Sequence, residues 1–194
     1  MMGYRVNANE LVETLHAWDE VIPGRGKIRL IACGGTALTL LGYKESTKDI
    51  DFLVPRQKEY QRLVKFLKQA GYKEMTTYGW KRTGESILFD LYPGKRIYST
   101  ELLSSPLKQG GNRKIREWKT IYLGILNSID LIISKMFRGT EVDIEDSLAL
   151  LKNEKVDFSE LENRYAETAR YDVSEKRVMR NFSLLRARLG RAKP

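Results

Sequence analysis

The spacing of apolar positions divides the chain into two parts. Up to about residue 126, apolar residues at helical spacing alternate with short continuous or alternating apolar runs, which are typical of strands. Beyond Asn127, a predicted helix N-cap, the apolar pattern is helical almost throughout. We therefore expect a mixed α and β domain at residues 1–126 and a helical domain at residues 127–194.

The first domain is predicted to alternate helices and strands. Its helices are expected at 10–20, 36–41 and 58–70. Its strands are expected at 28–32, 49–54, 75–82, 86–92 and 120–126. Asn9 is the predicted cap of the first helix, Gly71 is the predicted stop of the third, and Gly84 lies in the predicted turn of a hairpin. The region 93–117 is rich in Pro, Gly, Ser and basic residues and gives no clear prediction.

The second domain is predicted to contain four helices, at 128–138, 143–153, 159–170 and 174–189. Ser159 and Glu162 have the spacing of a capping box, so Ser159 is the expected start of the third of these helices. The last helix has Val178, Phe182 and Leu185 at helical spacing and arginines on its other face. Packing within the bundle is the favoured interpretation of this helix, and contact with RNA is the alternative.

A glycine pair and two aspartates carry the strongest chemical signal. Gly34 and Gly35 follow one apolar run, and Asp49 and Asp51 open another after the intervening residues 36–48. Side chains alternate between the two faces of a strand, so both carboxylates are expected on the same face. Two carboxylates at this spacing suit Mg²⁺, which prefers oxygen ligands and binds together with substrate phosphates. The pattern therefore indicates phosphoryl or nucleotidyl transfer.

Binding a triphosphate needs further groups, for which the sequence has candidates. The glycine pair leaves room for phosphate beside the backbone, and the N–H groups that open the next helix favour an anion. Thr36 adds a hydroxyl. Asp90, within an otherwise apolar strand, is the candidate for a third carboxylate, although a shift of one residue in register would turn it to the other face.

The net charge of +9 favours polyanionic partners, either nucleic acid, nucleotides or an acidic protein. The basic and aromatic stretch 113–119 fits contact with nucleic acid and fits equally a solvated loop beside a strand. The single cysteine, Cys33, excludes an internal disulfide and is expected to be buried, and His16 is expected on a helix surface. No apolar run reaches the roughly 18 residues of a membrane span, so no membrane partner and a cytoplasmic location are expected.

The stretch GGTALTLLGYKESTKDIDFLV resembles the signature of the DNA polymerase β-like nucleotidyltransferase superfamily. That signature is G-[GS], a gap, and D-h-[DE]-h, in which h is apolar. The form found here is most similar to minimal prokaryotic nucleotidyltransferases, including the AbiEii type. The resemblance implies an α+β fold, with a mixed sheet flanked by helices and a C-terminal helical bundle.

The resemblance also assigns roles to residues. It implies that the triphosphate is bound by residues around the glycine pair and the aspartates: Gly34, Gly35, Thr36 and Lys48. It implies that three carboxylates bind the metal and take part in catalysis: Asp49, Asp51 and Asp90. The implied cofactor is Mg²⁺, as two ions, with Mn²⁺ as a substitute.

A looser similarity extends into the helical half. AbiEii-like proteins have a helix with a lysine, followed by an arginine and a D-x-x-D pattern, and IDLIISKMFRGTEVDIED at residues 129–146 is similar. By this similarity Lys135 and Arg138 face the triphosphate, and Asp143 and Asp146 orient them. The alternative for Lys135 is a favourable interaction with the helix dipole, and the alternative for the two acids is capping of the next helix.

These expectations combine into metal-dependent transfer of a nucleoside monophosphate from a nucleoside triphosphate to a hydroxyl of tRNA or other RNA, a protein or a small molecule. The resemblance further implies a toxin–antitoxin or defence module, with a toxin or antitoxin as partner. Two other classes compete: a nucleotidyltransferase fold that only binds, and an RNA-binding accessory protein. The acceptor, the choice of triphosphate and the oligomeric state stay open at this point.

Overall fold

The computed structural model describes residues 4–191 of the 194-residue chain and divides into two compact units. The first unit comprises the residues up to 95 together with 105–126, and the second comprises 96–104 and the chain from 127 onward. Residues 96–104 thus belong to the helical unit, although they precede the boundary expected after residue 126. That boundary, as a division between domains, stays a prediction.

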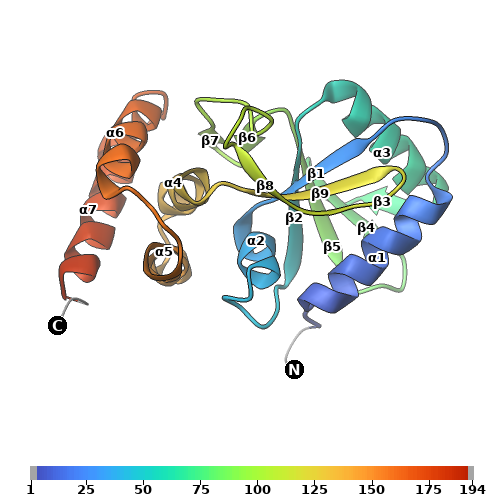
Figure 1. The fold of residues 1–194 in the computed structure, drawn as a ribbon, viewed down its shortest axis with the longest axis horizontal. Helices are drawn as coiled ribbons and strands as arrows, with labels where there is room; N and C mark the ends of the chain where they lie inside the picture. The colour runs from blue at the N-terminus through green and yellow to red at the C-terminus, as the bar shows by residue number, and fades with distance from the viewer. Residues whose placement is uncertain (1–3, 192–194) are drawn as a thin grey trace. The chain divides into compact units, whose positions relative to one another are not determined.

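Within the described residues, the first unit is built on a mixed sheet in the strand order β3-β4-β5-β2-β1-β9-β8 (Figure 1). Its strands are β1 (Ile28–Ala32), β2 (Asp49–Val54), β3 (Tyr72–Glu74), β4 (Gly79–Arg82), β5 (Leu88–Pro93), β8 (Asn112–Glu117) and β9 (Ile121–Leu126). β2 lies parallel to β5 and antiparallel to β1, and β1 lies parallel to β9. The strands predicted at 28–32 and 49–54 are confirmed, and so is the hairpin, as β4 and β5 with shorter arms.

The helices of the first unit are α1 (Ala8–Val21), α2 (Gly34–Leu40) and α3 (Gln57–Gln69). α1 and α3 cover the same face of the sheet, because the ring of Trp18 lies 5.9 Å from that of Phe66 and 4.6 Å from that of Phe89. These rings form the aromatic part of the apolar core of this unit. Gly71 follows α3 with a φ of +87° and is the left-handed stop that the sequence predicts.

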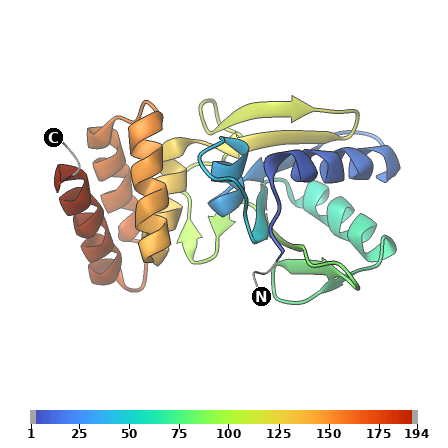
Figure 2. The ribbon, with the colours of Figure 1, turned by 90° about the horizontal axis from the view of Figure 1, so that it is seen from below.

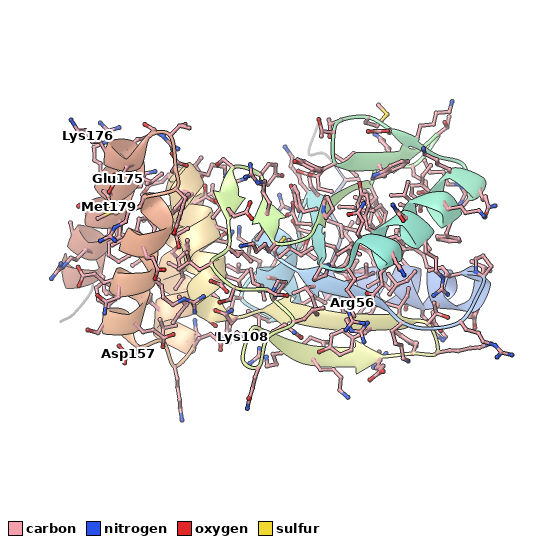
Figure 3. All side chains as sticks on the ribbon, turned by 90° about the horizontal axis from the view of Figure 1, so that it is seen from above. Arg56, Lys108, Asp157, Glu175, Lys176 and Met179 are labelled. Carbon is pink, nitrogen blue, oxygen red and sulfur yellow. The ribbon has the colours of Figure 1, made fainter. Side chains whose placement is uncertain are left out.

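The helix caps differ from those expected. The Asn7 side chain accepts the N–H of Glu10 at 3.0 Å, and the Glu10 carboxylate accepts the N–H of Asn7 at 3.0 Å. This reciprocal pair starts α1 earlier than predicted, so the assignment of Asn9 as the cap is wrong. Similarly, Asp157 (Figure 3) accepts two N–H groups of the first turn of α6 (Phe158–Ala169), and Ser159 lies inside that turn.

The second unit contains α4 (Ser128–Arg138), α5 (Glu141–Asn153), α6 and α7 (Glu175–Arg191), which pack together, and the short hairpin of β6 (Arg96–Ile97) and β7 (Thr100–Glu101). The Tyr165 ring stacks on Phe182 at 4.4 Å and meets the edge of Phe137 at 5.3 Å. The Tyr165 hydroxyl donates to the carbonyl of Val178 at 2.7 Å, which satisfies its buried polar atom. The predicted packing of the C-terminal helix is thereby confirmed. None of the described helices has both the length and the apolar character needed to cross a membrane.

The basic stretch after residue 112 is a strand. In the described part of the chain, β8 pairs with β9 alone and forms one edge of the sheet, as Figure 2 shows. Every residue of β8 after Asn112 is exposed, so no apolar alternation marks the strand in the sequence. A register shift between Lys114 and Arg116 leaves Ile115 as a bulge. Bulges and charges of this kind protect a sheet edge against pairing with other chains.

Two side chains of the first unit hold loops through backbone groups. The Asp19 carboxylate accepts the N–H groups of residues 119–121 at 2.6 to 3.2 Å. The Arg62 guanidinium donates to the carbonyl oxygens of residues 23–26 at 2.8 to 3.2 Å. These contacts fix the loops that lead into β9 and β1.

Candidate active site

Hydrogen bonds hold the start of β2 against the glycine turn. The Cys33 N–H donates to the Asp51 carbonyl at 3.1 Å. The Thr36 hydroxyl accepts the Asp51 N–H at 2.8 Å and donates to the Asp49 carbonyl at 3.3 Å, and the Thr47 hydroxyl donates to the same carbonyl at 2.9 Å. The backbone of the D-x-D segment is therefore positioned by the glycine turn and by residues at both ends of the gap in the signature.

Three aspartates share one face of the sheet. Asp51 lies opposite Asp90 in the parallel pairing of β2 with β5, and Asp49 lies two residues before Asp51. Paired residues of neighbouring strands and residues two apart point to the same face, so the register expected for Asp90 is confirmed. Asp51 and Asp90 are each 7% exposed, whereas Asp49 is exposed. Like charges at opposed positions destabilise a sheet, so a bound cation would stabilise this pair.

Glycine backbone lies beside both buried carboxylates. A Cβ at Gly34 would collide with Oδ2 of Asp51, and the φ of +55° at Gly34 favours glycine. A Cβ at Gly79 of β4 would lie 3.0 Å from Oδ1 of Asp90. At Gly35 a Cβ would lie 2.7 Å from the hydroxyl oxygen of Thr47. Side chains at Gly34 and Gly79 would fill space beside the two carboxylates, and a side chain at Gly35 would collide with Thr47.

The donor set fits a hard divalent cation. Three carboxylates on one face supply the oxygen ligands that Mg²⁺ prefers. Within residues 4–191, no three His, Cys, Asp or Glu side chains come close enough together to form a complete metal site. Asp51 and Asp90 thus form the centre of the candidate site. A site with three carboxylates would require the Asp49 side chain, exposed at the first residue of β2, to turn toward Asp51 and Asp90.

Tyr92 is a site residue that sequence reasoning missed. Its hydroxyl donates to Oδ1 of Asp51 at 3.5 Å, and its side chain is fully buried. Such a hydrogen bond orients a carboxylate that binds metal. Its position two residues after Asp90, on the same strand face, was the signal that could have revealed it.

Thr36 and Lys48, which are both expected at the triphosphate, differ in exposure. Thr36 is fully buried, and its hydroxyl bonds to the backbone of β2, so the structure gives this hydroxyl a structural role. Lys48 is exposed, immediately before Asp49. Lys48 therefore has a side chain that is free to move toward an anion, whereas Thr36 offers its backbone N–H.

The second unit gathers the residues of the looser similarity into one cluster. The Lys135 ammonium lies 2.6 Å from Oδ2 of Asp146 and 4.0 Å from Oδ1 of Asp143. Arg138 donates two hydrogen bonds to the Asp143 carboxylate, at 2.6 and 2.8 Å. Asp143 also forms a capping box with Thr140, which starts α5. The two aspartates hold the basic residues as expected, and Asp143 takes the alternative role in helix capping as well.

Exposure distinguishes the two basic residues. Lys135 is 3% exposed, whereas the Arg138 side chain is 54% exposed. The Arg138 guanidinium lies over the ring of Tyr98, 6.0 Å from its centroid. Tyr98 has a φ of +50°, which is uncommon for a residue other than glycine, and nothing in the region 93–117 marked it in the sequence. Within this unit Arg138, fixed by Asp143 and open to solvent, is the better candidate for contact with an anion.

Asp143 is expected to make stability depend on pH. Burial raises the pKa of Asp143, but the hydrogen bonds from Arg138 and Thr140 outweigh burial and hold the pKa below its ordinary value. A lowered pKa stabilises the fold fully above the ordinary aspartate value of about 4, and the contribution is lost as the pH falls through the folded pKa. In urea unfolding, Asp143→Asn should be less stable than the wild type at neutral pH, and the difference should shrink below about pH 4. A difference that is the same at every pH would contradict this.

Known proteins resemble this chain in part of its sequence and in its fold. The family described as "Nucleotidyltransferase of unknown function (DUF6036)" matches residues 113–191. No curated protein matches the sequence. The crystal structure of ANT(2")-Ia in complex with adenylyl-2"-tobramycin is similar with a TM-score of 0.55 at 17% identity, over 84% of this chain and 97% of that chain. A crystal structure of an antigenic nucleotidyltransferase-like protein from Paracoccidioides brasiliensis gives a TM-score of 0.52 at 13% identity, over 91% of this chain and 95% of that chain.

These similarities agree with the geometry on the fold. The two solved structures show that this chain has their fold, so the α+β nucleotidyltransferase fold expected from the signature is confirmed. The family match reaches from β8 through the helices of the second unit and carries the nucleotidyltransferase description there. The finer resemblance to the AbiEii type stays a prediction.

Proposed function

We propose that this chain is a metal-dependent nucleotidyltransferase, which moves a nucleoside monophosphate from a nucleoside triphosphate to a hydroxyl acceptor. One observation carries the proposal: Asp51 and Asp90 lie opposite each other on neighbouring strands, buried, with glycine backbone beside each of them. The fold supports it, since a protein with the same fold was crystallised with adenylyl-2"-tobramycin, a ligand that carries a nucleotidyl group.

The proposed roles follow from burial and position. Asp51 and Asp90 hold the cations, Tyr92 orients Asp51, and Asp49 turns in from the exposed start of β2. Two magnesium ions, replaceable by manganese, would be held by these carboxylates and would supply Lewis-acid stabilisation of the charge on the transferred phosphoryl group.

The triphosphate is proposed to bind beside the glycine pair. Gly34 and Gly35 have no side chain to block it, and Lys48 is exposed next to the aspartates. Contact of Arg138 with the triphosphate stays a prediction of the looser sequence similarity. The acceptor oxygen bonds to the α-phosphorus as the bond to pyrophosphate breaks, and the acceptor proton passes to water. Positive groups around the transferred group stabilise its charge in the transition state.

The test is a transfer assay. The purified chain is incubated with Mg²⁺, with each of the four triphosphates labelled at the α-phosphorus, and with RNA, cell protein or small molecules as separate acceptor pools. Label should appear in one pool and disappear with the Asp49→Ala, Asp51→Ala double variant. Absence of transfer in every pool, or transfer that the double variant retains, would refute the proposal. Nucleotide binding without transfer would instead support the silent binding module.

The role in a toxin–antitoxin or defence module, implied by the resemblance alone, stays a prediction. Its check is growth on expression of the chain in a bacterial host. A toxin arrests growth in a manner that the aspartate double variant abolishes, whereas an antitoxin leaves growth unchanged.

A further inference from the structure

Positive charge is distributed unevenly between the two units. The residues of the first unit include 20 Lys and Arg against 12 Asp and Glu, whereas those of the second include 14 against 13. Nearly all of the net charge of +9 thus belongs to the first unit. Four of its basic residues follow one another along β8 and the turn after it, and we call them the β8 basic strip: Arg113, Lys114, Arg116 and Lys119.

The β8 basic strip is exposed and keeps a positive charge. All four side chains are exposed, and Glu117 is the only acid among residues 112–119. Glu117 pairs with Lys27 at 3.1 Å and with Lys114 at 3.5 Å. Within residues 4–191, no carboxylate forms an ion pair with Arg116 or Lys119. Four basic residues against one acid leave the strip with a net positive charge, which attracts anions.

The surroundings of the strip favour a polyanion over a protein segment. The Ile115 bulge interrupts the regular edge that an added strand would need. Protein interfaces are anchored by large apolar or aromatic side chains in pockets, whereas here Ile115 is a lone exposed apolar residue. The Trp118 ring already contacts two side chains: His16 stacks on it with 6.1 Å between ring centroids, and the Arg116 guanidinium lies 5.7 Å from its centroid. Contact through charge alone, without base stacking, fits a phosphate backbone.

The strip begins at the same level of the sheet as the carboxylates. Arg113 pairs with Ile125, Ile125 with Ala32, and Ala32 with Phe52, the neighbour of Asp51. Three steps between strands correspond to about 14 Å. Because Phe52 and Asp51 point to opposite faces of the sheet, Arg113 points away from the face of the carboxylates, whereas Lys114, which pairs with Gly124, points to that face. RNA that contacts Arg113 therefore has to pass around the β8 edge before its end reaches Asp51 within the first unit.

We propose that the β8 basic strip binds the phosphate backbone of single-stranded RNA and presents an RNA end to the carboxylate site. The recruitment of an acceptor rests on the proposed function, whereas RNA binding by the strip does not. The binding is tolerant of sequence, because it uses phosphates, and it requires neither metal nor triphosphate.

The experiment measures fluorescence anisotropy of a labelled single-stranded RNA of mixed sequence across a range of salt concentrations, with EDTA and without triphosphate. The strip variant combines Arg113→Gln, Arg116→Gln and Lys119→Gln and keeps Lys114 with its partner Glu117. The wild type should bind with an affinity that falls steeply with salt. Loss of three phosphate contacts should weaken binding at low salt by at least about tenfold and reduce the slope of log affinity against log salt by about 2.

A matched control removes the same charge from the second unit. It combines Arg170→Gln, Lys176→Gln and Arg180→Gln, three exposed positions at the end of α6 and along the start of α7, where Figure 3 labels Lys176. This variant should bind RNA like the wild type. An equal or larger loss in the control would overturn the proposal in favour of the α7 interpretation. Absence of binding by the wild type, or binding of labelled polyglutamate in place of RNA, would overturn it as well.

The experiments distinguish a failure of the proposed RNA binding from a failure of the proposed transferase function. The Asp49→Ala, Asp51→Ala double variant should bind the same RNA at least as well as the wild type, because two acidic groups are removed and the strip is intact. RNA binding without transfer leaves the strip assignment standing and refutes only the acceptor role. Transfer without RNA binding refutes the strip assignment and leaves the transferase standing.

Discussion

Replacing Asp51 by asparagine is expected to reduce nucleotidyl transfer by more than about 100-fold while leaving thermal stability unchanged or raised. Outer partners of metal ligands already contribute about 10- to 100-fold to activity, so loss of a proposed ligand should cost more. Asparagine has the shape of aspartate, so the bond from Tyr92 and the pairing of β2 with β5 are kept. Without metal, the substitution also removes the repulsion between Asp51 and Asp90. Initial transfer rates and thermal unfolding in EDTA measure the two effects.

Asp19 provides the matched control, because it lies in the same unit and is also 7% exposed. Its carboxylate binds backbone N–H groups of residues 119–121 and has no role in the proposed chemistry. Asp19→Asn should therefore lower stability by about 1–3 kcal/mol and leave transfer unchanged at temperatures where the variant is folded. If Asp51→Asn loses stability as Asp19→Asn does, Asp51 has a structural role and the assignment as a metal ligand fails.

Replacing Lys135 by alanine is expected to lower the free energy of unfolding by about 3–5 kcal/mol. The Lys135 ammonium is buried and lies 2.6 Å from Asp146 and 4.0 Å from the fully buried Asp143. Its removal leaves two buried carboxylates with less positive charge to compensate them. For a chain of this length, such a loss corresponds to a melting temperature lower by roughly 10 °C. Urea and thermal unfolding of the two proteins measure the difference.

A double variant tests whether the ion pair of Lys135 with Asp146 is responsible for the loss of stability. Lys135→Met with Asp146→Asn removes both charges and keeps similar volumes, so it should recover most of the stability that Lys135→Ala loses. A loss below about 1 kcal/mol for Lys135→Ala would mean that the ammonium is not held in the cluster. In that case Lys135 returns as a candidate for the triphosphate, as the looser sequence similarity suggested.

The parts of the fold that could be predicted from the sequence depend on short-range signals. The apolar run before Gly34 and the D-x-D strand became β1 and β2 because buried strands carry continuous apolar residues. Asp90 was identified as the candidate third carboxylate because it interrupts an apolar strand, but its position opposite Asp51 depends on the pairing of β2 with β5, whose register the sequence left open.

The parts that were missed depend on contacts between distant residues or on the absence of an apolar pattern. β8 has both faces exposed, so it has no alternation to recognise. Tyr92 is an apolar strand residue in the sequence, and only the register with Asp51 reveals its hydrogen bond. The pairing of Lys135 with Asp146 joins α4 to α5, a contact that the spacing along the chain does not determine. At α1 two asparagines compete for the cap, and the carboxylate of Glu10 decides between them.

The clamp that Arg62 forms on residues 23–26 has a practical consequence for chemical labelling. The clamp recognises carbonyl oxygens, which every residue possesses, and the side chain of Arg25 is exposed. The sole native thiol, Cys33, is fully buried. An Arg25→Cys substitution therefore provides one accessible attachment point for a fluorophore or spin label on a tethered loop, and the native cysteine can stay in place.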